Sequence, residues 1–443
     1  MKTYQDLLEL GENESARMDF VREIINQHKN SPEYRNAVIA EDYAKQQNTT
    51  IMRYRKTIYN LQGREVDDLW SANYKLPSGF FPRFVMQENQ YLLGNGITWD
   101  EASTKDRLGK QFDTRVQQAG KIALTEGCAF GFWDMDKLRV FKLTEFAPLY
   151  DEENGALRAG VRFWQLTGDK PLRATFYEED GFTEYRWKDG AGEIIKEKRP
   201  YILKIRETQV DGMEIYDGEN YPSFPIIPLW GNDFHGSELM RGRSKIDAYD
   251  LIESGFANDL DNAQIYWILH NTGGMDDLDL SQFIERLKFV GAAVVDDTAG
   301  TGAEAHTVEI PHEARDSLLE LLRKDIYRDF MALDVENIVS GAITATQIRA
   351  AYEALNSKTD EYEYNVLEFL HGVLNVIGID DSPTFTRSVM VNVQEGVQTL
   401  VQAAPFLDDD YVTEKIMTLL GDKDKVDEVL SRRDADDIER IEE

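Results

Sequence analysis

The spacing of apolar residues divides the chain into a helical first part, a β-rich middle part and a set of long helices. Up to about residue 125, apolar side chains such as Phe20 and Ile24 recur at helical spacing. A helix end is predicted at Ser31-Pro32, because the residue before a proline is disfavoured in the helical region. A further helix from Phe84 to Leu93 is predicted to end at the glycine-rich turn that follows it. The first part is therefore expected to be mainly helical.

Between about residues 126 and 222 the apolar period changes from helical to alternating. Leu157, Ala159, Val161 and Phe163 occupy every second position, which is typical of half-buried strands. Residue pairs that tolerate positive φ, and so suit tight antiparallel hairpins, recur through this part: Asn154-Gly155, Asp180-Gly181, Asp189-Gly190, Asp211-Gly212 and Asp217-Gly218. The pattern predicts an antiparallel meander, closed by a proline-rich extended segment at 222–228.

A long helix is predicted after the meander. Ser244 and Asp247 fit a helix-start pattern, and apolar residues then step by three or four along one face as far as Trp267. We expect this helix to stop at 271–274. A compact insert is expected next, with a short helix at 280–287 and an apolar strand at 290–295.

Two further long helices are predicted beyond the insert. Pro311 opens the first of them, and an irregular stretch at 333–342 follows it. Thr344 and Gln347 match a capping box at the start of the second. That helix is expected to end near Gly378, with about 34 residues and a length of roughly 50 Å. The complete pattern predicts an α+β fold.

The composition is that of a globular protein with an unusual charge. The 443 residues include 81 acidic and 49 basic side chains, a net charge of −32, and the pI is about 4.6. This balance argues against a surface that clamps nucleic acid throughout, because such binding uses Lys and Arg to displace counterions from phosphates. The single cysteine, Cys128, excludes an intrachain disulfide, and we find neither a signal peptide nor a membrane span. An intracellular protein is expected.

The familiar catalytic and cofactor motifs are absent from the sequence. There is no P-loop, no dinucleotide-binding glycine pattern and no nucleophile elbow. The six histidines are scattered, and Cys128 has no candidate base near it in the sequence. Asp276 and Asp277 resemble the start of a calcium loop, yet the glycine and distal glutamate of such a loop are missing. We expect no enzyme activity, no cofactor and no metal site.

Long apolar helices without a catalytic constellation favour packing between copies of the chain over a large monomeric core. An enzyme whose site is assembled only by the fold remains an alternative of a different class.

The order of these elements and several local stretches resemble the portal proteins, or head-to-tail connectors, of tailed double-stranded DNA phages, in particular the siphophage and myophage group. The resembling stretches cover residues 76–96, 127–134, 146–151, 244–259 and 308–327. No single one is diagnostic, but they occur in the family's order over roughly residues 15–380. Another virion structural or adaptor protein is the nearest alternative.

The resemblance implies a division of the chain into named parts. Residues 1–240 would form a wing, 241–270 and 312–333 two stem helices, and 271–311 a clip. Residues 334–343 would form a tunnel loop, 344–379 a long wing helix, and 380–443 a short crown with an acidic tail. Twelve copies would form a ring at one capsid vertex of the virion, after assembly in the host cytoplasm.

The resemblance also implies partners and site residues. Double-stranded DNA would pass through the ring with weak, non-specific contact, for packaging and later ejection. The clip would dock the terminase large subunit and then a head-tail adaptor, and the capsid and scaffolding proteins would hold the ring. The implied clip residues are Asp276, Asp277, Arg286 and Lys288, and the implied tunnel-loop residues are Asp334, Glu336, Asn337, Ser340 and Gly341.

The acidic charge suits such a channel, since each phosphate contact adds to the binding free energy and so to friction on moving DNA. We hypothesise that Lys324, Arg328 and Arg349 provide sparse steering contacts or intersubunit ion pairs, while the rest of the wall repels DNA weakly. The alternative is that these bases pair with Asp325 and Asp329.

Overall fold

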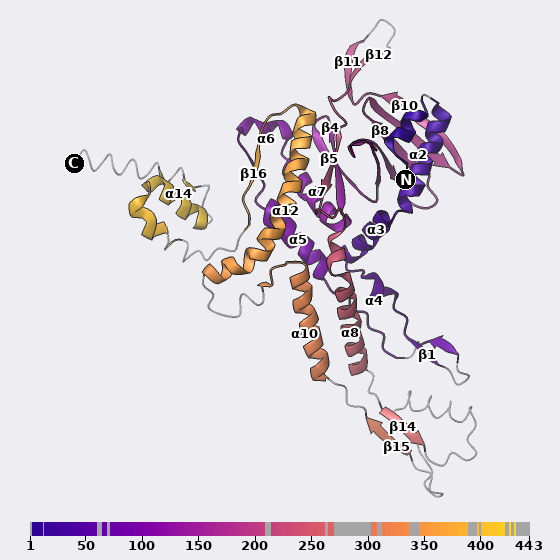
Figure 1. The fold of residues 1–443 in the computed structure, drawn as a ribbon, viewed down its shortest axis with the longest axis vertical. Coiled ribbons are helices and arrows are strands. Elements are labelled where there is room, and N and C mark those ends of the chain that lie inside the picture. Colours follow the sequence, from indigo (N-terminus) through magenta and orange to yellow (C-terminus); the bar gives the residue numbers. More distant parts are fainter. Residues whose placement is uncertain are drawn as a thin grey trace, which may run out of the picture.

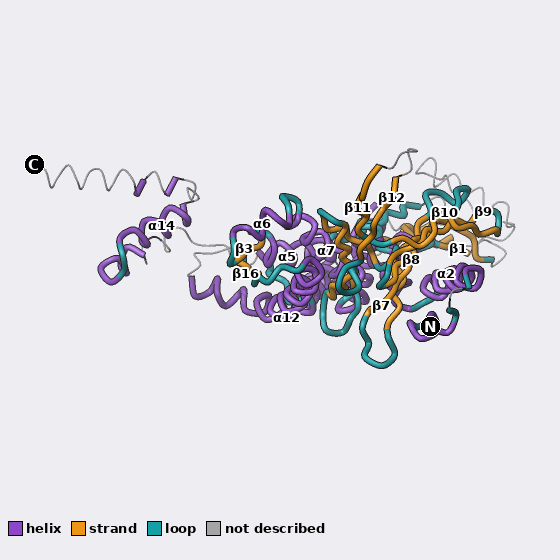
Figure 2. The backbone as a smooth tube through the Cα atoms, turned by 90° about the horizontal axis from the view of Figure 1, so that it is seen from above, coloured by secondary structure: helices purple, strands orange, loops and turns teal. Residues whose placement is uncertain are grey.

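The computed structural model describes residues 2–11, 13–59, 64–68, 71–208, 214–261, 265–269, 303–307, 312–335, 345–388, 397, 400–420, 425–426 and 429–430. The molecule is elongated (Figure 1). Sheets and helices form a body, the paired helices α8 and α10 project from it, and α14 lies off to the other side of the body from the large sheet. Figure 2 shows the same body from above, with strands gathered at one end and α14 beyond the opposite end.

The first part is mainly helical, as predicted. Its helices are α1 (Tyr4–Glu9), α2 (Glu14–Lys29), α3 (Pro32–Ala44), α4 (Thr49–Arg53), α5 (Phe80–Leu93), α6 (Ala102–Leu108) and α7 (Phe112–Glu126). The predicted break is confirmed, because the Ser31 hydroxyl accepts a hydrogen bond from the Tyr34 N–H and Pro32 occupies the first turn of α3. A short hairpin of β1 (Thr57–Tyr59) and β2 (Glu65–Asp67) interrupts the helices, and helical periodicity did not predict it.

The predicted antiparallel meander is confirmed. A five-stranded sheet has the order β10-β9-β8-β7-β6, so each strand pairs with its neighbour in sequence. Its strands are β6 (Phe146–Tyr150), β7 (Leu157–Trp164), β8 (Leu172–Glu178), β9 (Gly181–Lys188) and β10 (Ala191–Arg199). A second sheet has the order β13-β4-β5, from β4 (Cys128–Asp134), β5 (Lys137–Lys142) and β13 (Ile226–Trp230).

One expected turn is wrong. Asp217-Gly218 lies inside β12 (Glu214–Glu219), which pairs with β11 (Ile202–Thr208), and Gly218 is opposite Leu203. An added Cβ at Gly218 would lie 1.8 Å from a Pro200 side-chain atom. The glycine is therefore required for a close approach and not for a reversal of the chain.

The main core lies between the helices and the smaller sheet. α12 (Ala345–Ile377) packs on β4 and β13, with Val366, Phe369 and Leu370 buried. The approach is close, because a Cβ on Gly131 in β4 would lie 2.5 Å from the Phe369 ring. Gly378, with φ of 72°, follows the last residue of α12, as predicted from the sequence.

The prediction of one long helix from Ser244 to Trp267 is wrong at the C-terminal end. α8 spans Arg243–Asp261, and Ile265–Leu269 forms strand β14, paired with β15 (Ala303–Thr307). The run Ile-Tyr-Trp-Ile-Leu is β-branched and aromatic, so it favours a strand once a partner strand is present. The second long helix is confirmed as α10 (His312–Asp329). The helix and strand expected at 280–287 and 290–295 lie outside the described residues.

The remaining elements are short. β16 (Pro383–Phe385) pairs with β3 (Ile97–Trp99), and so joins the chain after α12 to the N-terminal part. The 3₁₀ turn η1 (Glu238–Arg241) precedes α8, and η2 (Ala404–Phe406) precedes α14 (Asp409–Leu420). Within the described part of the chain, no helix combines the length and the apolar character that a membrane crossing requires.

Candidate functional site

The two projecting helices, called the stalk below, run antiparallel and are joined by ion pairs at both ends. Near the body, the Lys245 Nζ of α8 lies 2.7 Å from Asp329 Oδ2 of α10. At the far end, Arg315 of α10 lies 2.6 Å from Asp259 of α8. Pairs of this kind, partly exposed, contribute little energy each, but together they fix the register of the two helices. The stalk is thus a defined unit that extends from the body and leads toward β14 and β15 (Figure 1).

The end of α10 nearest the body is held by aromatic packing. Tyr327 and Phe330 are buried against Phe80 and Phe84 of α5, with ring centroids 4.8–6.1 Å apart. Contacts at this separation add to the free energy gained from burying the rings. The stalk is therefore rooted in the main core and not hinged on a loop.

The chain leaves α10 along a fixed path. The side-chain amide of Gln87 donates to the Leu333 carbonyl at 3.0 Å and accepts from the Leu333 N–H at 2.9 Å. The Leu333 side chain is buried with Tyr91, Tyr352 and Leu355. These contacts place the start of the expected tunnel loop at the junction of α5, α10 and α12.

Of the expected tunnel-loop residues, the structure describes Asp334. Its carboxylate accepts from the Arg323 guanidinium at 3.2 Å and 3.4 Å, and its side chain is 14% exposed. The negative charge of Asp334 is therefore partly compensated within the same chain. Glu336, Asn337, Ser340 and Gly341 lie outside the described residues, as do the expected clip residues Asp276, Asp277, Arg286 and Lys288.

The candidate basic residues lie where the sequence placed them, on the helices beside this segment. Lys324 is 3.7 Å from Glu320, and Arg328 is 2.6 Å from Asp325, both within α10. The two basic side chains are 65% and 73% exposed, so they are also open to a partner. Arg349 lies in the first turns of α12, and its side chain is outside the described part.

A ladder of polar side chains on α8 was missed by the sequence analysis. Asp250, Ser254 and Asn258 are four residues apart and buried. Their side chains accept from the backbone N–H groups of Ser78, Leu76 and Tyr74, at 3.0, 3.0 and 2.6 Å. The extended segment 74–78 is thereby fixed along α8 as an additional layer of the stalk. Polar residues at i, i+4 and i+8 on a helix were the available signal, although the same spacing also occurs on solvated faces.

A buried charge network joins α5, η1 and α12, and it was also missed. Lys358 Nζ lies 2.5 Å from Glu88 Oε2 and 2.7 Å from Glu238 Oε2, and none of the three side chains is more than 4% exposed. Arg241 and Asn232 also bond Glu238, at 2.9 Å and 2.8 Å. Burial raises the pKa of Glu88 to about 7, against the attraction of Lys358. The pKa of Glu238 is lowered, since its attraction to Lys358 and Arg241 outweighs the opposing effect of burial.

No other constellation in the described part suggests catalysis. Cys128 is fully buried, and burial raises the pKa of its thiol, which disfavours the thiolate form needed by a nucleophile. The described residues hold no group of three or more His, Cys, Asp or Glu placed to bind a metal ion.

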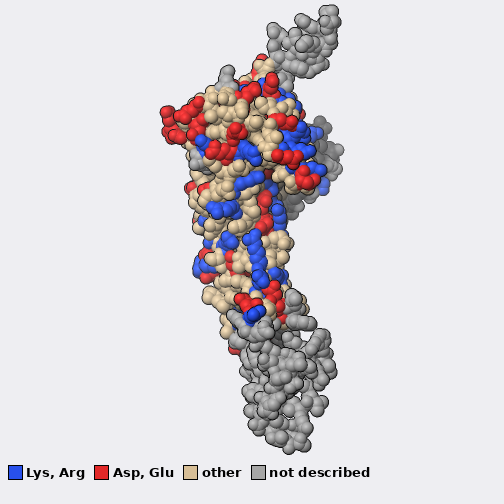
Figure 3. Space-filling model, turned by 90° about the vertical axis from the view of Figure 1, so that its right-hand side faces the viewer, with Lys and Arg blue, Asp and Glu red and all other residues tan. Residues whose placement is uncertain are grey.

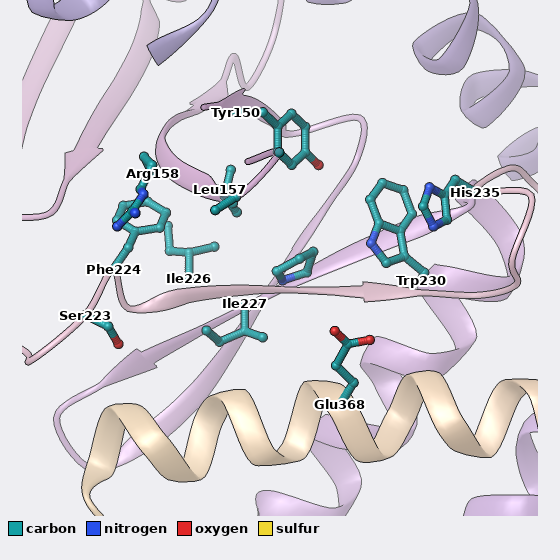
Figure 4. A pocket seen from close by; sticks show the side chains of 13 residues that line it. Tyr150, Leu157, Arg158, Ser223, Phe224, Ile226, Ile227, Trp230, His235 and Glu368 are labelled. Carbon is teal, nitrogen blue, oxygen red and sulfur yellow. The ribbon is translucent and has the colours of Figure 1, made fainter. Parts of the chain in front are cut away.

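A hollow with a volume of about 580 Å³ lies between β13, the β6–β7 turn and α12 (Figure 4). Its walls include Tyr150, Phe224 and Ile227, with Glu368 on the α12 side. Trp230 and His235 are stacked at one end, with ring centroids 4.0 Å apart. The lining is polar and apolar in about equal measure, and it offers no nucleophile with an adjacent base.

The family model and two curated relatives name the same family. The family model described as "Phage portal protein, SPP1 Gp6-like" matches residues 37–442. The portal protein of Clostridium phage phiCD119 is 24% identical over 402 residues, covering 80% of this chain and 86% of that protein. The portal protein of Bacillus phage SPP1 is 23% identical over 388 residues, covering 80% and 74%.

Among solved structures, a chain from the neck of an empty gene transfer agent particle has a TM-score of 0.41 at 12% identity, and the match covers 77% of this chain and 90% of that one. A chain from the neck of the native particle gives a TM-score of 0.39. With a family model matched over most of its length, and a fold that unites a helical and sheet body with a two-helix stalk, the chain belongs to the phage portal protein family.

Proposed function

We propose that the chain assembles into a ring, expected to be a dodecamer, at one capsid vertex. The ring is the channel through which double-stranded DNA is packaged and later ejected. The observation that carries this proposal is the stalk, two antiparallel helices rooted in an aromatic core and continuing into a long helix beside the loop segment. Family members are structural proteins, and the chain is assigned no catalytic step.

The proposed parts follow the helices as they are observed. The stem consists of α8 and α10, and the clip is the region between them, including β14 and β15. Residues 334–343 are the proposed tunnel loop, α12 supports it, and the chain after α12 forms the crown. The helical N-terminal part and the meander form the wing. The clip docks the terminase large subunit and then the adaptor, and the capsid and scaffolding proteins hold the ring during assembly in the host cytoplasm.

The charges on α10 suit the wall of a channel. Lys324 and Arg328, in the half of the helix nearer the body, are exposed, and each forms an ion pair within α10. Basic side chains that already have acidic partners make fewer contacts with phosphates and release fewer counterions. DNA therefore slides past them with little friction. The same reasoning applies to Asp334 in the proposed tunnel loop, because Arg323 compensates its negative charge.

The proposal is tested by the solution mass of the full chain, measured by light scattering with and without scaffolding protein, together with negative-stain images. A ring of about a dozen copies with an axial hole is expected. A chain that stays monomeric at high concentration with scaffolding protein present contradicts the proposal. A second test replaces Lys324 and Arg328 by Gln in the phage. If these residues steer DNA, the packaged DNA content is expected to stay near normal while ejection is altered.

A further inference from the structure

The segment on the outer side of α8 is a projecting arm. We define the stalk arm as the described residues between 49 and 78, which comprise α4, the β1–β2 hairpin and the extended segment on the polar ladder. In Figure 1 the arm lies on the side of α8 away from α10. The two sides of the stalk therefore present different surfaces.

The stalk arm leaves large apolar side chains in solvent. Met52, Tyr54, Val66, Tyr74 and Leu76 are 37–50% exposed. The β1–β2 hairpin is a sheet of only two strands, so its outer edges are unpaired among the described residues. A two-stranded sheet is marginally stable in water by itself, and several large apolar side chains exposed on one short segment favour an interaction surface. We therefore expect the arm to be covered in the assembled protein.

A groove beside the arm has room for a side chain from another molecule. It measures about 300 Å³ and lies between the arm and α8, with Tyr54 and Tyr74 from the arm and Leu251 and Gly255 from α8 among its lining residues. A Cβ added at Gly255 would meet nothing within 4 Å. The groove is thus open at the helix surface and has aromatic walls suited to a leucine.

The charge of the arm differs in sign from that of the chain. Residues 49–78 hold five Lys or Arg and three Asp or Glu, a net charge of +2, so the rest of the chain carries −34. Figure 3 looks onto the side on which the arm projects and shows Lys and Arg side chains down the lower described surface. Arg53 is exposed and has no ion-pair partner among the described residues. An acidic surface is the electrostatic complement of this arm.

The other side of the stalk provides such a surface. On α10, Leu321 is 56% exposed, and Glu313, Asp316 and Glu320 are exposed along the neighbouring face of the same helix. Apolar and acidic groups on α10 thus match apolar and basic groups on the arm. Because the two surfaces lie on opposite sides of α8, one copy cannot join them, whereas a second copy can.

We propose that the stalk arm of one copy docks onto the exposed surface of α10 in the next copy, with Leu321 directed toward the groove beside Tyr54 and Tyr74. The contact is heterologous, since different patches meet, and repetition of such a contact closes a ring when the rotation allows it. Nucleic acid is a poorer occupant, because Glu65 and Asp67 on the same hairpin repel phosphates. The inference rests on the proposed ring and specifies which surfaces form it.

The test uses the full chain and charge reversal on both surfaces. The arm variant carries Arg53→Glu and Arg55→Glu, and the α10 variant carries Asp316→Arg and Glu320→Arg. We expect each to raise the concentration below which the ring dissociates, by about tenfold or more in the per-contact dissociation constant. The chain carrying all four substitutions is expected to recover the ring. Arg107→Glu with Lys110→Glu, an equal charge change on exposed residues near α6, is the matched control.

Cross-linking gives a readout that does not depend on a substitution. A carbodiimide joins lysine amines to carboxylates at contact distance, so Lys56 or Lys75 is expected to link to Glu313, Asp316 or Glu320 in covalent multimers. Circular dichroism of each variant verifies that it folds. A wild-type ring that the reversals leave unchanged, or whose arm lysines link only elsewhere, overturns this inference and leaves the proposed ring intact. A wild-type chain that forms no ring with scaffolding protein overturns both.

Discussion

Lys358 offers a sharp test of the structure, because its charge has no access to water. The ammonium group lies between Glu88 and Glu238 at 2.5 and 2.7 Å, and its side chain is 4% exposed. Replacing it by Met keeps a long, flexible apolar stem of similar length, so the packing changes little. The substitution removes the positive charge and leaves two buried carboxylates facing each other.

The expected loss follows from the cost of an uncompensated buried charge. Breaking a buried ion pair by removing one partner typically costs about 3–5 kcal/mol. An unfolding entropy of about 2.1 cal/mol/K per residue amounts to roughly 0.9 kcal/mol/K over the 443 residues. Lys358→Met is therefore expected to lower the Tm by about 3–5 °C if the chain unfolds as one unit, and by more if a smaller unit unfolds.

The assay is a thermal scan at fixed protein concentration, with two comparisons. Lys358→Met combined with Glu88→Gln is expected to recover most of the loss, because Glu238 keeps Arg241 and Asn232 as partners. Lys45→Met, which breaks a partly exposed ion pair with Glu41, is expected to change the Tm by less than about 1 °C. A Tm for Lys358→Met within that limit, or a double variant no more stable than the single one, would refute the reasoning.

Three further predictions concern the pH response, the polar ladder and a strained glycine. Because burial raises the pKa of Glu88 to about 7, its contribution to stability is present below its unfolded pKa of 4.5 and is lost as the pH rises through about 7. The Tm of Glu88→Gln relative to wild type is therefore expected to rise between about pH 5 and pH 8 in thermal scans, and a constant difference would contradict this. Asp250→Ala removes the acceptor of the half-buried Ser78 N–H, at about 1–3 kcal/mol, and is expected to speed amide exchange and proteolysis in the stalk arm. Unchanged exchange would argue against the ladder. Gly127 has φ of 100°, and an added Cβ would lie 2.8 Å from the Gly236 carbonyl carbon. Gly127→Ala is therefore expected to lower the Tm more than Gly109→Ala, because Gly109 has φ of 82° but open space around it. Equal Tm shifts would show that the contact with Gly236 does not affect stability.

Long amphipathic segments were the part of the fold that could be read from the sequence. The helices α5, α10 and α12 and the meander were predicted because the period of apolar residues is a local property that survives folding. The predictions fail where a segment distant in the sequence determines the local secondary structure. Ile265–Leu269 has both helical and strand character, and pairing with Ala303–Thr307, more than thirty residues away, makes it a strand.

The candidate site divides in the same way. The ordered motifs identified the family, and the positions of Lys324 and Arg328 on α10 followed from helical spacing. The pairing of Arg328 with Asp325 was one of the two interpretations of the sequence, whereas the pairing of Lys324 with Glu320 and the partial compensation of Asp334 by Arg323 were seen only in the structure. Sequence places residues on an element, whereas the ion pairs depend on which rotamers and neighbouring elements surround them.

The sequence by itself determined the type of most long elements, the acidic charge and the resemblance to portal proteins, because periodicity, composition and motif order are properties of the chain. Only the tertiary structure decided which polar residues are buried and what they bind. Asp250, Ser254 and Asn258 look like a solvated helix face until segment 74–78 lies along them. Lys358 and Glu88 are 270 residues apart in the chain. Their side chains are removed from water only when α5 and α12 pack together, and only then does pairing of the two charges affect stability.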